Sequence, residues 1–208
     1  MRRAVAPIAV IGLSFIFGGC MSKFPAVSKM SSQATGEAAL VVGLAPAKDG
    51  RPNNHAGSIG GIPIRAGSEA VEYVSKTMRN KLVERGFQVL DVPGPTKRPD
   101  AGEAPAARII TVIPILQSVS VNTWDELLFP ATVDVDVAAQ VYDETGKVAY
   151  GKKVHVEQRK RLWIFISGRQ PGRQIARALE AAVSQILEDP EFLDALHAPP
   201  RAAAGEGL

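Results

Sequence analysis

Two long alternating segments in the second half of the chain constrain its fold most strongly. Between Ala131 and Tyr142, valines at every second position share one side, while threonine, aspartate and glutamine occupy the other. This period of two is that of a half-buried strand. A turn over Asp143–Gly146 predicts that residues 148–161 return as an antiparallel partner. One face of this hairpin needs a covering layer, and the charges on its other face are expected to pair across the strands: Asp134 and Asp136 with Lys152, Lys153 or His155.

Two further segments have the apolar period of helices that could supply this layer. Ser68 is predicted as the N-cap of the first, in which apolar residues recur at spacings of three and four until Gly86 ends it. The second runs from Arg173 to Leu187 after a break at Gly168, Pro171 and Gly172, and a short last helix is expected over 191–196. The pattern predicts an α+β fold, a mainly antiparallel sheet with two amphipathic helices packed on one face.

The remaining elements of the expected domain are shorter or less regular. Strands are predicted near 39–44, 87–92 and 108–121, and Pro114 in the last of these indicates a bulge or an edge position. Residues 46–67 are rich in glycine, proline and asparagine, which predicts a long loop that is either functional or disordered. We expect one domain over 40–197 and a disordered tail over 198–208.

The first twenty residues have the organisation of a targeting segment. Arg2 and Arg3 precede an apolar run of roughly 13 residues, which suits a signal peptide and is shorter than the roughly 20 residues of a membrane-spanning helix. The run ends at Gly18-Gly19-Cys20, and Cys20 is the only cysteine of the chain.

This segment resembles the lipobox of bacterial lipoproteins. The resemblance implies that residues 1–19 are cleaved, that Cys20 is the lipidation site and carries acyl chains such as palmitate, and that residues 20–39 form the lipidated cysteine and a flexible spacer. By the same resemblance, Met21 after the cysteine implies the periplasmic face of the bacterial outer membrane. The alternative is a soluble secreted protein with an incidental cysteine.

Composition excludes several classes of function. Loss of Arg2 and Arg3 lowers the formal net charge from +3 to about +1, so net charge gives no support to a nucleic-acid partner. If Cys20 is acylated, the chain has no thiol for a disulfide, a cysteine-ligated metal or thiol catalysis.

No group of residues in the sequence has the spacing of a catalytic or metal site. His55, His155 and His197 are far apart and lack the spacing of metal ligands. Asp134 and Asp136 could act as paired carboxylates, but charge pairing on an exposed hairpin face explains them better. We therefore predict no catalytic residue, no cofactor and no metal, and a protein that is not an enzyme.

Aromatic residues in two connecting segments are the candidate contacts with a partner or a membrane. Trp124 and Phe129 lie in one segment, and Arg161, Trp163 and Phe165 lie in the other. Cations beside Trp and Phe suit an anionic membrane surface or a protein interface. The alternative for the second segment is a buried strand end.

The chain as a whole resembles the YajG-type family of uncharacterised bacterial lipoproteins. The resemblance rests on Cys20, the segment 41–51, the passage from Leu82 to Val89 around Gly86, the hairpin, and the closing helix with 189–193. It implies a general shape shared with envelope lipoproteins and supplies no catalytic residues.

Two hypotheses of function follow from these features. The first is a membrane-tethered, non-enzymatic envelope lipoprotein that binds an envelope protein complex or peptidoglycan through the loop 46–67 and the regions of Trp124 and Trp163. The second is a carrier of an apolar ligand, such as lipid, held between sheet and helices in transport or outer-membrane maintenance. An envelope hydrolase is a distant third.

Overall fold

Three long antiparallel strands form one side of the sheet. The computed structural model describes residues 20–21, 23–27, 40–59, 62–94, 109–122, 130–161 and 169–197. In it β8 (Pro130–Tyr142) lies between β7 (Ile110–Asn122) and β9 (Val148–Arg161) and pairs antiparallel with both. The predicted hairpin is confirmed, and its turn has Gly146 at a φ of +78°.

Shorter strands extend the sheet on the other side of β7. β2 (Val41–Leu44) lies between β7 and β6 (Gln88–Asp91) and pairs parallel with both. β3 (Lys48–Asp49) and β4 (His55–Ile59) also pair parallel with β7. β5 (Ile62–Arg65) pairs antiparallel with β4, and β1 (Cys20–Met21) pairs parallel with β5. The sheet is therefore mixed, with its longest pairings antiparallel.

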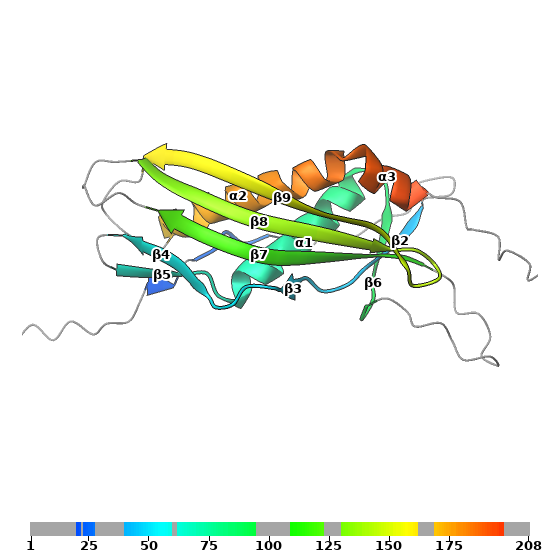
Figure 1. The fold of residues 1–208 in the computed structure, drawn as a ribbon, viewed down its shortest axis with the longest axis horizontal. Helices are drawn as coiled ribbons and strands as arrows, with labels where there is room; N and C mark the ends of the chain where they lie inside the picture. The colour runs from blue at the N-terminus through cyan, green and yellow to red at the C-terminus, as the bar shows by residue number, and fades with distance from the viewer. Residues whose placement is uncertain are drawn as a thin grey trace, which may run out of the picture.

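The helices pack against this sheet. α1 (Ser68–Glu84) and α2 (Arg169–Glu188) contact each other and lie behind the long strands in Figure 1, and α3 (Pro190–His197) continues from α2 toward β8 and β9. The α+β fold predicted from the sequence is confirmed. None of the described helices is long and apolar enough to cross a membrane.

The core fills the space between α2 and the long strands. Alternate valines of β8 and the apolar stripe of α2 are buried in one cluster, as their periods of two and about 3.6 require. The fully or almost fully buried members include Val133, Val135, Val137 and Val141 of β8 and Ile175, Ala178, Leu179, Ala182, Val183, Ile186 and Leu187 of α2.

The prediction of a loop over residues 46–67 is wrong, because this segment contains β3, β4 and β5. Ala56 and Ile64 from this segment are buried. Gly57 has a φ of +114°, and a β-carbon built on it would lie 2.1 Å from the carbonyl oxygen of Val121. Glycine is needed here for a close approach of two strands, so a composition typical of loops arises from strand packing.

The helix ends partly differ from the prediction. Gly67, and not Ser68, is the N-cap of α1, without a side-chain capping hydrogen bond. Gly86 ends α1 as predicted: its φ is +88°, and its N–H donates to Val83 O while Phe87 N–H donates to Leu82 O. α2 begins at Arg169 and includes Pro171, which its first turn accepts because proline lacks only an N–H that has no intrahelical acceptor there.

Pro114 lies in a strand with neighbours on both sides, and the expected bulge there is wrong. The expected edge position holds only locally, because no described strand pairs with residue 114 on the side away from β8. Pro114 pairs with Ala139 of β8 and is buried. On its other side, β2 pairs with residues 110–112 and β3 with 115–116, so position 114 falls between two short strands. The register shift of β7 occurs instead between Leu116 and Ser118.

Candidate functional site

The face of β7–β9 that points away from α2 has a group of polar side chains, which we call the polar face. Each strand contributes residues at alternate positions, because side chains two apart on a strand share a face. The polar face includes Ser118 and Asn122 of β7, Asp134 and Asp136 of β8, and Lys153, His155, Glu157 and Arg159 of β9.

Asp136 is the centre of this group. The register places Ser118 and His155 on either side of it. Ser118 Oγ donates to Asp136 Oδ2 at 2.7 Å, His155 Nδ1 lies 3.0 Å from Oδ1, and Lys153 Nζ lies 3.3 Å from Oδ2. Partial burial raises the pKa of Asp136, but the hydrogen bonds from Ser118, His155 and Lys153 outweigh it and hold the pKa below its usual value.

A second pair of contacts lies nearer the end of the sheet. Asn122 Nδ2 donates to Asp134 Oδ2 at 3.4 Å, and Arg159 Nε donates to Glu157 Oε1 at 2.7 Å. The cross-strand pairing predicted for Asp136 with Lys153 and His155 is confirmed, whereas Asp134 contacts an amide.

Lys152 points to the opposite face, where it binds Asp189 between α2 and α3. Lys152 Nζ and the Tyr150 hydroxyl donate to Asp189 Oδ2 at 2.7 and 3.0 Å, and Glu191 N–H donates to Asp189 Oδ1 at 3.1 Å. The ring of Tyr150 meets that of Phe192 edge-on, with centroids 5.4 Å apart. These contacts attach α3 to β9, and the expectation that Lys152 pairs on the polar face is wrong.

The chemistry of the polar face differs from that of a hydrolase site. In a serine triad the histidine contacts the serine hydroxyl and the aspartate orients the histidine. Here Asp136 lies between Ser118 and His155, so the hydroxyl proton points at a carboxylate that is held in its charged form. Among the described residues there is also no group of three or more His, Cys, Asp or Glu that could hold a metal ion.

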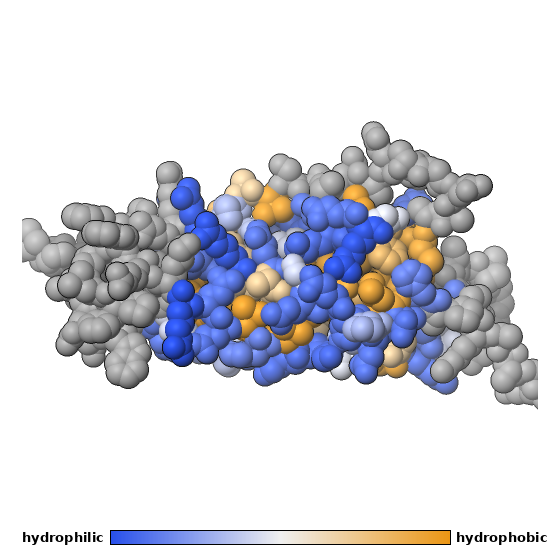
Figure 2. Space-filling view, turned by 90° about the horizontal axis from the view of Figure 1, so that it is seen from above, coloured by the Kyte–Doolittle hydropathy of each residue, from blue (hydrophilic) through white to orange (hydrophobic). Residues whose placement is uncertain are grey.

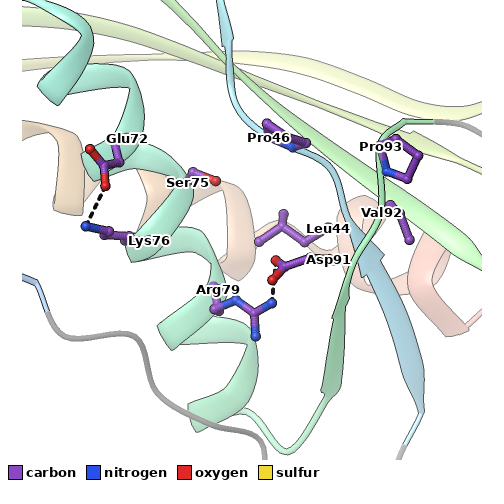
Figure 3. A pocket seen from close by; sticks show the side chains of 9 residues that line it. All are labelled: Leu44, Pro46, Glu72, Ser75, Lys76, Arg79, Asp91, Val92 and Pro93. Atoms are coloured by element: carbon purple, nitrogen blue, oxygen red, sulfur yellow. Dashed lines mark hydrogen bonds and ion pairs between the residues drawn. The ribbon is translucent and has the colours of Figure 1, made fainter.

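A groove of about 460 Å³ lies between α1 and the strands β2 and β6 (Figure 3). Its charges are paired within its own wall: Arg79 with Asp91, and Lys76 with Glu72 at 2.6 Å. The Arg79 Nη1 also donates to Val89 O at 3.4 Å. A ligand there would displace an ion pair or contact only the apolar wall. The lining residues are Leu44, Pro46, Glu72, Ser75, Lys76, Arg79, Asp91, Val92 and Pro93.

The space between α2 and β8, where the sequence predicted an apolar ligand as the alternative function, is filled by side chains. Val135 and Val137 of β8 and Leu179 of α2 have no exposed surface. Tyr73 of α1 donates its hydroxyl hydrogen bond to Glu180 and so joins the two helices. A ligand between these elements would have to separate them.

The residues predicted to contact a partner lie largely beyond what the structure describes. Trp124, Phe129, Trp163 and Phe165 lie outside the described residues. Arg161 is the last residue of β9 and Cys20 the first of β1, but the side chains of both also lie outside the described part of the molecule. The proposed roles of these six residues therefore stay predictions.

Sequence reasoning misses two parts of the arrangement. It does not identify Ser118 as a partner of Asp136, although polar residues at 118, 120 and 122 follow the period of two. It also misses that the backbone of Lys23 passes close to Gly172 of α2 and that the ring of Phe24 lies 5.6 Å from that of Tyr73 of α1. The only signal for these contacts is Phe24 and Val27, two large apolar residues in a polar segment.

The chain matches no protein-family model, and no curated protein matches its sequence. Among solved structures, protein XCC0632 of Xanthomonas campestris, of family DUF330, matches at 10% identity and a TM-score of 0.46, over 85% of this chain and 93% of that one. Lipoprotein GNA1162 of Neisseria meningitidis matches at 12% identity and a TM-score of 0.39, over 72% and 99% of the two chains. A minor lipoprotein of Acinetobacter baumannii matches at 10% identity and a TM-score of 0.39, over 72% and 91%. Two of these three proteins are described as lipoproteins.

Proposed function

We propose that this chain is a membrane-tethered, non-enzymatic lipoprotein of the bacterial envelope that binds a partner through the polar face. The partner is an envelope protein complex or peptidoglycan. One observation carries the proposal: α2 covers one side of the long strands, while the other side presents a row of hydrogen-bonded charges centred on Asp136. Such a surface suits binding because its side chains are already oriented, which lowers the entropy lost on association.

The geometry around Asp136 supports a binding role over a catalytic one. The carboxylate accepts hydrogen bonds from three neighbours, so neither Ser118 nor His155 is positioned to activate the other. The face carries charges of both signs, which suits a complementary protein surface.

In-cell photo-crosslinking tests the proposal. We expect p-benzoylphenylalanine at Ser120 of β7, which lies beside Asp134 of β8, to form a discrete adduct, and the same group at Glu84, at the exposed end of α1, to form none. Positions 124 and 163 test the predicted aromatic contacts in the same way. Adduct mass separates a protein from peptidoglycan fragments released by muramidase, and equal labelling from 84 and 120 would refute a specific polar face.

The proposed location is the periplasmic face of the outer membrane, through acyl chains on Cys20. Several acyl chains hold a protein on a bilayer almost permanently, since each buried methylene contributes about 0.8 kcal/mol. We expect Cys20→Ser to leave the membrane fraction and mass spectrometry of the wild type to find an acylated N-terminal peptide. Retention of the variant on membranes without any acylated peptide in the wild type would refute the tether. The YajG-type resemblance stays a prediction.

A further inference from the structure

The described residues 20–21 and 23–27, which we call the strap, are attached to the folded domain from Cys20 onward. Cys20 and Met21 pair with Ile64 and Arg65 of β5. The backbone of Lys23 passes over the start of α2 so closely that a β-carbon on Gly172 would lie 2.1 Å from Lys23 O. The flexible spacer predicted to begin at residue 20 is therefore wrong for residues 20–21 and 23–27, and the proposed lipidation site is attached directly to the domain.

Side chains of the strap also hold it against the helices. The ring of Phe24 lies 5.6 Å from that of Tyr73, and Phe24 and Val27 are partly buried against the core. Phe24 thus packs against α1 while Lys23 packs against the start of α2, and Tyr73 is itself hydrogen-bonded to Glu180 of α2. An acyl chain on Cys20 would thus be fixed to one edge of the sheet.

The strand register shows which end of the molecule this edge belongs to. One row across the sheet runs through Cys20, Ile64, Gly57, Val121, Val133 and Gln158. Val121 is one residue from the end of β7, and Val133 and Gln158 are three residues from the outer ends of β8 and β9. Cys20 therefore lies at the left end in Figure 1, about 30 Å along the strands from the β8–β9 turn.

Exposed cations lie at this end of the molecule, and Figure 2, which views the β9 and α2 side, shows strongly hydrophilic side chains at the same end. Arg65 pairs in register with Met21, and Arg173 follows Gly172, against which Lys23 packs. Among the exposed cations described at this end, only Arg159 has an ion-pair partner, which is Glu157. The exposed cations are Lys23, Arg65, Arg159, Arg173 and Arg177, and the nearby acids include Glu69 and Glu72 beside the strap and Asp134 and Glu157 on the polar face.

We propose that the strap orients the domain with this end toward the bilayer, where Lys23, Arg65 and Arg173 contact anionic lipid headgroups. The inference rests on the proposed acylation of Cys20. Acyl chains on Cys20, which lies at the edge of the sheet, would enter the bilayer beside these cations. Cations at a membrane surface are attracted by anionic lipids. The strands then point away from the membrane, and the polar face remains open to a partner in the periplasm.

Depth-dependent quenching tests the orientation. Acylated protein is reconstituted in vesicles of phosphatidylcholine and phosphatidylglycerol whose headgroups carry a nitroxide quencher. A fluorophore is attached to one of two variants, Thr132→Cys at this end of the sheet or Lys147→Cys in the β8–β9 turn at the far end. We expect strong quenching at 132 and little at 147. Gly172→Ala, or Phe24→Ala if the first variant does not fold, should reduce this difference while the protein stays on the vesicles.

Charge reversal tests the headgroup contact without the lipid anchor. The mature chain from residue 20 with Cys20→Ser is expected to bind phosphatidylglycerol vesicles and not phosphatidylcholine vesicles. Arg65→Glu with Arg173→Glu should weaken this binding at least about tenfold, since each cation contributes about fivefold. Lys81→Glu with Lys147→Glu changes the net charge equally at the far end and should weaken it less than about twofold.

The outcomes separate the two proposals. If Cys20 is acylated but quenching at 132 does not exceed that at 147, or both charge-reversed pairs behave alike, the orientation is wrong and the proposed function stands. If Cys20 carries no acyl group, the tether proposed above fails and the oriented anchor fails with it.

Discussion

The two faces of β7–β9 belong to the same strands, but they are stabilised by different interactions. On the covered face, Val135 and Val137 contact α2 and are fully buried, so their free-energy contribution comes from removing apolar surface from water. On the polar face, Asp136 and His155 keep contact with water, and each hydrogen bond replaces one that the unfolded chain makes with solvent. The covered face should therefore determine stability, which leaves the polar face available for recognition.

Truncation in the covered face should have the largest effect. Leu179→Ala removes a fully buried side chain of α2 and is expected to lower the free energy of unfolding by about 2–5 kcal/mol. Ser120→Ala on the polar face is the control, with an expected change within about 0.5 kcal/mol. Urea unfolding monitored by circular dichroism measures both. Equal losses would show that the two faces contribute alike.

A reciprocal exchange of valine and threonine sharpens the contrast, because the two side chains have nearly the same shape. Val135→Thr places a hydroxyl in the covered face and should cost about 1–3 kcal/mol of unfolding free energy. Thr132→Val on the polar face should change it by less than about 0.5 kcal/mol. The same unfolding assay applies, and a cost below about 0.5 kcal/mol for Val135→Thr would mean that the covered face admits water.

The sequence predicts the covered face better than the surroundings of the sheet. Alternation in β8 and the stripe of α2 are local patterns, and both depend on one buried side per element. The parallel pairings of β2, β3 and β4 with β7 depend on contacts between distant segments, for which a single sequence has no periodic signal. Gly57 illustrates the difficulty, since its role is set by the carbonyl of Val121.

The polar face is predictable only in part. The charge partners of Asp136 follow from the hairpin turn, because the turn determines the register of β8 and β9. Ser118 belongs to β7, whose register with β8 includes a shift that no turn specifies. The strap escapes prediction because its contact with Gly172 joins residues about 150 positions apart, which a local pattern cannot indicate.

Removal of the central carboxylate of the polar face should have a smaller, pH-dependent effect. Asp136→Asn is expected to lower the free energy of unfolding by about 1 kcal/mol at neutral pH. Because the pKa of Asp136 is lower in the folded than in the unfolded chain, its stabilisation is present above the unfolded value near 3.9 and is lost as the pH falls through the folded value. Unfolding at pH 7 and below pH 4 should show the difference between wild type and variant shrinking in acid. A constant difference would place the stabilisation outside the ionised carboxylate.

The smallest effect is expected for Arg159→Ala. The Arg159 and Glu157 side chains are 74% and 42% exposed, so water and salt screen their attraction and both lose side-chain entropy when they pair. The free energy of unfolding should change by less than about 0.5 kcal/mol, and added salt should reduce this difference further because it screens the pair. Glu157→Ala is the matched control and should behave in the same way. A loss above about 1 kcal/mol for either variant would mean that the ion pairs of the polar face stabilise the fold as the covered face does, and the division of roles between the faces would then fail.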